Sequence, residues 1–151
     1  MSTATLSSPR TSPDYVAAES YRMTAPAVAS TARIAREFVR AILSATHHPS
    51  LIDTALACVS ETVSNVVVHT RVPLVAVEIT TKQRRVITAV RDDSPDGVPM
   101  PREAQFAEDS GRGLQLVQSL SDGFGVDWIY GPGLTIVGKR VWFELRDEVI
   151  A

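Results

Sequence analysis

Glu61 and Asn65 lie four residues apart in a segment whose apolar residues recur at helical spacing. Their side chains therefore project from the same side of the predicted helix, one turn apart. An asparagine carbonyl oxygen is a suitable ligand for Mg²⁺, and a carboxylate one turn earlier could orient or deprotonate an attacking hydroxyl or water. The same spacing is typical of a solvated polar face, because the apolar stripe of this segment points roughly the opposite way. Both interpretations stay open.

A second candidate is Asp92, which ends a strand-like segment. Period-two alternation places it on the same face as Val86 and Val90. A carboxylate at the end of an inward-facing apolar row needs a donor, and the exocyclic amine of adenine is one, because an ionised aspartate offers only acceptors. The run of residues 92–95 is equally typical of a turn.

Two glycines, Gly111 and Gly113, flank Arg112 where a helix is predicted to begin after a long loop. Glycines there would let the backbone approach a ligand closely, and unpaired amides together with the helix dipole favour a phosphate. Arg112 could meet that phosphate or stay in solvent. A pair of glycines is a weak motif by itself, since most such pairs are simply turns between a loop and a helix.

The elements that must position these residues follow from periodicity and turn signals. Helices are predicted over 26–45, over 50–70 and after residue 113, and strands over 20–24, 74–80, 85–91, 124–129 and 134–145. Residues 94–110 lack periodicity and contain three prolines, which predicts a functional or mobile loop. Residues 1–18 are predicted to be a disordered tail and 19–147 one domain. This order favours an α+β fold, a two-layer sandwich with about three helices on one face of a mixed, mostly antiparallel sheet.

Composition excludes several classes of function. The chain has 151 residues, 44% of them hydrophobic, and a formal net charge of -2, which gives no electrostatic footprint for nucleic acid. Its one cysteine, Cys58, predicts a reducing compartment and a buried apolar position. We find no apolar run approaching about 20 residues and no signal peptide, so a cytoplasmic protein without a membrane segment is predicted. His47 and His48 are predicted to be surface residues at a helix end, because no third metal ligand lies at useful spacing.

Each of these signals is weak alone, but their order along the chain is more specific. Residues 61–69 (ETVSNVVVH) resemble the N-box of the histidine-kinase-like (Bergerat, or GHKL) ATPases, residues 90–92 (VRD) the G1 box, and residues 111–117 (GRGLQLV) the G2 box. Within that superfamily the chain is most similar to the stand-alone anti-sigma-factor serine/threonine kinases. The similarity covers roughly residues 21–146, including the ending GKRVWF at 138–143.

This resemblance implies a Bergerat ATP-binding fold and a role for each motif residue. Asn65 would ligate Mg²⁺, Glu61 would be the activating carboxylate, and Asp92 would bind adenine. The G2 box would hold the rest of the ATP through four residues, Gly111, Arg112, Gly113 and Leu114. Residues 94–110 would form a lid over the phosphates. The phosphate acceptor would be a serine or threonine of a STAS-domain anti-anti-sigma protein. The same protein could sequester a sigma factor, and a homodimer is implied.

The chain departs from the family pattern at several positions. Ser94 and Asp96 stand where the G1 box usually has glycines, with Gly97 one place late. Arg140 occupies a place where a threonine commonly supports the adenine-binding aspartate, which implies an altered base pocket. Two alternatives therefore stand beside the kinase hypothesis: a non-catalytic nucleotide-binding module for protein interaction, and a scaffold that has lost nucleotide binding.

Overall fold

A single antiparallel sheet organises the computed structural model, which describes residues 18–94 and 109–148. Within these residues the sheet has five strands in the order β1 (Glu19–Pro26), β2 (Leu74–Thr81), β3 (Arg85–Asp92), β5 (Ile136–Arg146) and β4 (Gly123–Tyr130). The strands are rich in valine, isoleucine, threonine and aromatic residues, which suit a pleated, half-buried surface. All four pairings are antiparallel, so the sheet is antiparallel rather than mixed in the described part of the chain.

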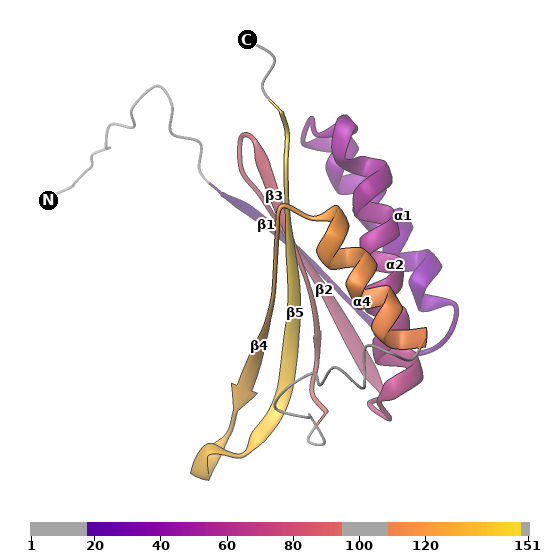
Figure 1. Ribbon diagram of the computed structural model, residues 1–151, viewed down its shortest axis with the longest axis vertical. Coiled ribbons are helices and arrows are strands. Elements are labelled where there is room, and N and C mark those ends of the chain that lie inside the picture. The colour runs from indigo at the N-terminus through magenta and orange to yellow at the C-terminus, as the bar shows by residue number, and fades with distance from the viewer. Residues whose placement is uncertain (1–17, 95–108, 149–151) are drawn as a thin grey trace, which may run out of the picture.

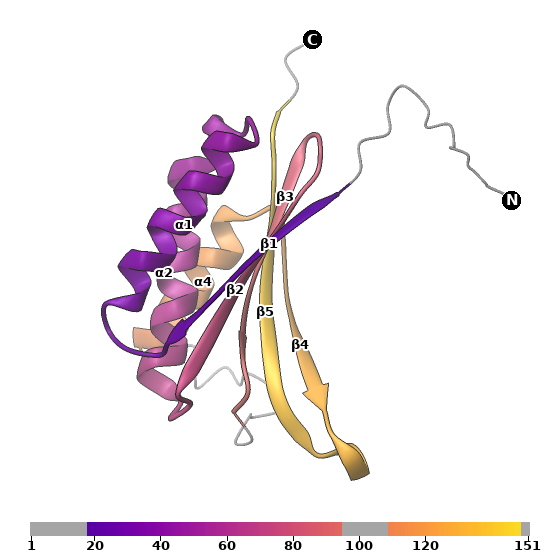
Figure 2. The same cartoon turned by 180° about the vertical axis from the view of Figure 1, so that it is seen from behind.

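In the described residues, three α-helices cover one face of this sheet (Figure 1) and no helix lies on the other face (Figure 2). They are α1 (Thr31–Ala45), α2 (Ile52–His69) and α4 (Asp109–Leu120). Two short 3₁₀ helices complete the described elements, η1 (Pro49–Leu51) before α2 and η2 (Pro132–Leu134) in the β4–β5 turn. The α+β two-layer sandwich predicted from the order of elements is confirmed.

Helix α2 is the central element of the helical layer, because it packs against both α1 and α4. The core lies between this layer and the sheet, and its largest fully buried apolar side chains are Phe143, Leu43, Ile79, Val39, Val59, Val63, Val75, Val77, Val86, Val90 and Val117. By length and composition alone, the segment Pro49–His69 would reach across a membrane, contrary to our expectation. Its apolar residues at 55, 58, 59, 63 and 66 are instead buried in this core, as suits the central helix of a folded domain.

The first and the third predicted helices begin at other residues in the structure than the sequence predicted. Strand β1 continues through Pro26, and α1 starts only at Thr31, whose hydroxyl donates a hydrogen bond to the Pro26 carbonyl. The backbone N–H of Ala27 donates to the carbonyl oxygen of Pro73 at 2.9 Å, which prolongs the contact of β1 with β2. Helix α4 starts at Asp109, so the two glycines predicted to precede it lie inside its first two turns. The predicted tail, apart from Ala18, and residues 95–108 of the predicted lid lie outside the described residues.

His48 is buried, so the prediction that both histidines are surface residues is wrong for this one. Its side chain lies with Nε2 2.8 Å from the carbonyl oxygen of Lys82 and Nδ1 3.3 Å from Oγ1 of Thr46. His47 is exposed and has a positive φ of 66°, a left-handed conformation that turns the chain from α1 toward η1. This turn carries the ring of His48 inward, where it joins the helical layer to the β2–β3 turn.

Candidate functional site

Glu61 packs against the first part of α4. A Cβ atom built on Gly113 would overlap Oε2 of Glu61 and lie 3.4 Å from its Cδ. Gly113 is buried, and α2 and α4 pack along this contact. The polar face of α2 is therefore not simply solvated, since α4 covers it at Glu61 and only a residue without a side chain leaves room for the carboxylate.

Asn65, one turn further along α2, is half-buried, and its Nδ2 atom is buried without a hydrogen-bond partner among the described residues. A buried polar atom left unpaired costs about 1–3 kcal/mol, so it calls for an explanation such as a ligand. The two amide atoms exchange places when the side chain rotates, so either can occupy this position. The unpaired amide thus marks a polar position next to Glu61 that a ligand or ion could satisfy.

The carboxylate of Asp92 is fully buried at the end of β3, on the side of the sheet that faces the helices. Its Oδ1 accepts a hydrogen bond from the backbone N–H of Ser94 at 2.9 Å. Its Oδ2 lies 2.6 Å from the ammonium nitrogen of Lys139, which is the residue opposite Asp92 on β5. Gly138 permits this close approach, because a Cβ there would come within 2.5 Å of the Asp92 carbonyl oxygen.

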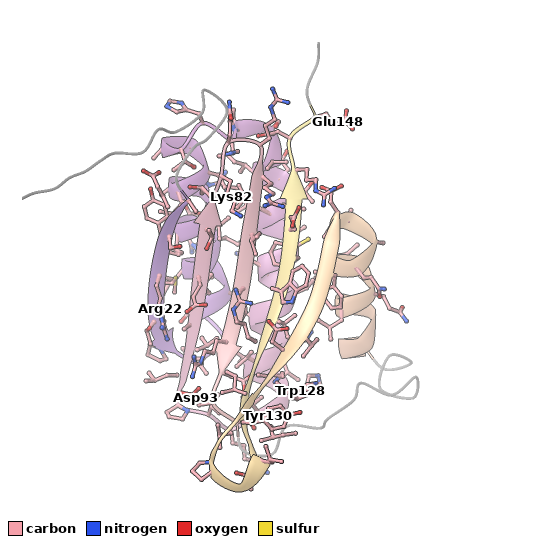
Figure 3. All side chains as sticks on the ribbon, turned by 90° about the vertical axis from the view of Figure 1, so that its left-hand side faces the viewer. Arg22, Lys82, Asp93, Trp128, Tyr130 and Glu148 are labelled. Carbon is pink, nitrogen blue, oxygen red and sulfur yellow. The ribbon has the colours of Figure 1, made fainter. Side chains whose placement is uncertain are left out.

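The elements that carry these groups meet at one end of the molecule. The C-terminal ends of α2 and β3 and the N-terminal end of α4 are all at the lower end in Figure 1, on the helix-covered side of the sheet. The β2–β3 turn is at the opposite end, as the labels of Lys82 and Asp93 in Figure 3 show. The structure therefore brings the C-terminal part of α2, which carries Asn65, the strand-terminal acid and the start of α4 to the same end of the two-layer sandwich, while Glu61 lies midway along α2, against α4.

Arg140 does not take part in this arrangement, contrary to our expectation. Along β5, side chains alternate between the two faces, and Arg140 lies on the face without helices. There its guanidinium lies 3.4 Å from Glu78 and 3.1 Å from Asp127, and Glu78 is also paired with Arg22 at 3.3 Å. The residue beside the buried aspartate is Lys139. Arg140 instead belongs to a network of ion pairs on the open face of the sheet.

Lys139 is the site residue that sequence reasoning missed. The signal was present, because alternation from Leu145, Phe143 and Val141 reaches Lys139 on the core-facing side of β5. A lysine at the end of such a row needs a buried acceptor, and the facing position on β3 is Asp92. Knowing that β3 and β5 are neighbours was necessary, since 47 residues separate the two side chains.

The chain matches the family model of the histidine kinase-like ATPase domain over residues 25–141. This match spans α1, α2, β2, β3, α4 and β4, together with the last two residues of β1, the first part of β5 and every candidate residue. The chain belongs to the histidine kinase-like ATPase family. No curated protein matches it.

Family membership identifies an ATP-binding domain with the Bergerat fold. The roles of the single residues remain predictions. Leu114 is half-buried in α4, whereas the surroundings of Gly111 and the side chain of Arg112 are outside the described part, so the contact of these residues with ATP stays a prediction. Ser94 is buried in the described structure, whereas Asp96 and Gly97 are outside the described residues.

Cys58 lies on α2 three residues before Glu61 and is completely buried, as predicted. Burial raises the pKa of its thiol to about 11, and the negative charge of Glu61 contributes in the same direction. The thiol is therefore neutral near pH 7 and a poor nucleophile. Cys58 acts as a small core residue beside the candidate site and not as a reacting group.

Proposed function

We propose that this ATP-binding domain is a regulatory serine/threonine kinase of the anti-sigma-factor type. It would transfer the γ-phosphate of ATP to a serine or threonine of a STAS-domain anti-anti-sigma protein, and it could also sequester a sigma factor. The observation that carries the proposal is the close approach of the Glu61 carboxylate to Gly113, in the second turn of α4. It supports a carboxylate held next to the helix start at which family resemblance expects the phosphates.

The residues fit a magnesium ion at the same place. The buried Nδ2 of Asn65 has no partner in the described part of the chain, and rotation of the amide would put Oδ1 there instead. The side-chain oxygens of Asn65 and Glu61 would then be the hard ligands that Mg²⁺ prefers. Bound with ATP, Mg²⁺ would neutralise phosphate charge. Asn65 would hold the ion, and Glu61 would orient or accept a proton from the attacking hydroxyl. Positioning and charge neutralisation are the main requirements for phosphoryl transfer.

Transfer of ³²P from γ-labelled ATP to purified STAS-domain proteins from the same genome tests this proposal. We expect transfer that needs Mg²⁺ and that falls about 100-fold or more in Glu61→Gln, with ATP affinity nearly unchanged. Ser60→Ala is a matched control, because Ser60 is the neighbouring α2 residue and its hydroxyl instead accepts a hydrogen bond from Arg36 at 2.9 Å. Transfer by Glu61→Gln at the wild-type rate would show that this carboxylate has no catalytic role.

A second candidate function is a non-catalytic nucleotide-binding module. It is favoured by Ser94, which stands at a usual glycine position and whose backbone N–H is bonded to Asp92. This function would give ATP binding and a rise in melting temperature without transfer to any partner. A ligand at a hundred times its Kd stabilises the folded state by about 2.7 kcal/mol, so a thermal shift with ATP separates both functions from a scaffold that binds no nucleotide.

A further inference from the structure

Within residues 18–94 and 109–148, the ion pair of Lys139 and Asp92 has unused hydrogen-bonding capacity on both sides. An ionised carboxylate offers about four acceptor positions, and the described residues use one on each oxygen. A lysine ammonium has three donors, and one is directed at Asp92. The pair therefore presents an acceptor and a donor whose heavy atoms are 2.6 Å apart. Such a pair is complementary to a base edge that carries a donor next to an acceptor.

We propose that Lys139 is a base-specificity residue, whose ammonium donates to N1 of adenine while Asp92 accepts from the 6-amino group. The inference rests on the proposed use of this end of the molecule as the ATP site. In adenine the 6-amino donor and the N1 acceptor are neighbours on one edge, in the order that the pair requires. Guanine carries an acceptor at position 6 and a donor at N1, so in the same orientation it would place an acceptor against the carboxylate and a donor against the ammonium.

Because Asp92 is buried, we expect a base to bind to the intact ion pair of Asp92 and Lys139 and not to separate the two residues. The Asp92 side chain has no exposed surface, whereas that of Lys139 is 23% exposed. Moving the ammonium away to admit a base would leave a buried carboxylate with a single partner, which is strongly unfavourable. Keeping the ion pair and adding the base to its open side requires no such loss. Lys139, being partly exposed, is the member of the pair that can turn a second N–H toward a ligand.

Nucleotide affinities measured by isothermal titration calorimetry test the inference. The ligands are ATP, 1-deaza-ATP, in which a C–H replaces N1, and GTP. We expect the wild-type protein to bind ATP at least tenfold more tightly than 1-deaza-ATP and than GTP. Lys139→Met should bind ATP at least tenfold more weakly than the wild type and should bind ATP and 1-deaza-ATP within about twofold of each other. Lys82→Met is the matched control, since Lys82 lies at the opposite end of the sheet and should leave all three affinities unchanged (Figure 3).

Removing the lysine alone leaves Asp92 buried without its cation, so the folded state of Lys139→Met must be verified by circular dichroism. A second pair of variants avoids that charge. Asp92→Asn retains Lys139 and should still prefer ATP to 1-deaza-ATP, although both bind more weakly. Asp92→Asn combined with Lys139→Met should lose the preference.

Three results would overturn the inference while leaving the ATP site intact. The first is tighter ATP binding by Lys139→Met than by the wild type, which would mean that the ion pair competes with the base. The second is an unchanged preference for ATP over 1-deaza-ATP in the variants without Lys139. The third is tighter binding of GTP than of ATP by the wild type. A wild-type protein that binds none of the nucleotides would instead refute the proposed function and the inference together.

Discussion

Gly113 in α4 lies directly over the carboxylate of Glu61 in α2, so closely that a Cβ at position 113 would overlap Oε2. The contact joins two segments separated by the whole β2–β3 hairpin in the chain. It fixes the carboxylate against the second turn of α4, which begins at Asp109. The relationship leads to a direct test of whether the position of this carboxylate matters.

Gly113→Ala should separate activity from stability. The added methyl group displaces the end of the flexible Glu61 side chain, which is a small structural cost, and alanine is favoured over glycine in a helix by about 1 kcal/mol. We therefore expect an unfolding free energy within about 1 kcal/mol of the wild type but phosphoryl transfer reduced about 100-fold, as for loss of a general base. Urea unfolding and the ³²P assay measure the two effects. Wild-type transfer in this variant would mean that Glu61 can act from another position.

Gly138→Ala should act on the backbone instead. Its Cβ would lie 2.5 Å from the carbonyl oxygen of Asp92 and 3.2 Å from Cα of Asp93, and main-chain atoms cannot swing aside. We expect a loss of about 1–3 kcal/mol in unfolding free energy, together with weaker ATP binding, because β3 and β5 are pushed apart at Asp92.

Gly123→Ala is the control for both glycine variants. A Cβ at position 123 would meet Cβ of Glu144 and the ring of Trp142 at an ordinary 3.5 Å. Gly123 is the first residue of β4 and pairs with Glu144 of β5, which in turn pairs with Ile87 of β3. These pairs lie away from Asp92. Equal losses of ATP affinity in Gly138→Ala and Gly123→Ala would contradict a local effect on Asp92.

The raised pKa of the Cys58 thiol predicts a loss of stability at alkaline pH. Its folded-state pKa is raised from 9.0 to about 11 by burial first and the charge of Glu61 second. The folded state therefore holds the thiol proton more tightly than the unfolded state does. This contribution is complete below about pH 9 and is lost as the pH rises toward 11, by up to about 2–3 kcal/mol.

Cys58→Ala removes the titrating group, so the difference between the two proteins isolates this effect from other alkaline titrations. We expect the unfolding free energies of wild type and variant to converge, or to cross, between pH 8 and pH 10.5 in urea titrations. Curves that stay parallel over that range would mean that the thiol does not change its pKa on folding.

His48→Ala should destabilise the protein without altering nucleotide binding. The variant loses the contact of Nε2 with the Lys82 carbonyl oxygen at 2.8 Å and leaves a cavity in a nearly closed site. We expect a loss of about 2–4 kcal/mol from these two effects together. The Kd for ATP, measured well below the melting temperature, should be unchanged because His48 is at the end of the sheet opposite Asp92. His47→Asn is the control, since asparagine tolerates the positive φ at that position.

The sequence by itself determined the elements and their faces. The apolar spacing of residues 52–66 predicted α2, and the alternation through Val86 and Val90 placed Asp92 inward, because periodicity along one element is a local property. It did not predict that β1 continues to Pro26 or that α4 begins before Gly111. These boundaries depend on partners elsewhere, such as the Pro73 carbonyl that accepts a hydrogen bond from Ala27.

Only the tertiary structure decided which chemical groups meet. The polar side of α2 at Glu61 could have faced solvent, and packing of α4 through Gly113 closes over it. Likewise, the neighbour of Asp92 was expected near Arg140, but the antiparallel register of β3 with β5 places Lys139 opposite it and turns Arg140 to the open face. A shift of one residue reverses the face of a strand side chain, and this register is set by contacts between strands distant in sequence.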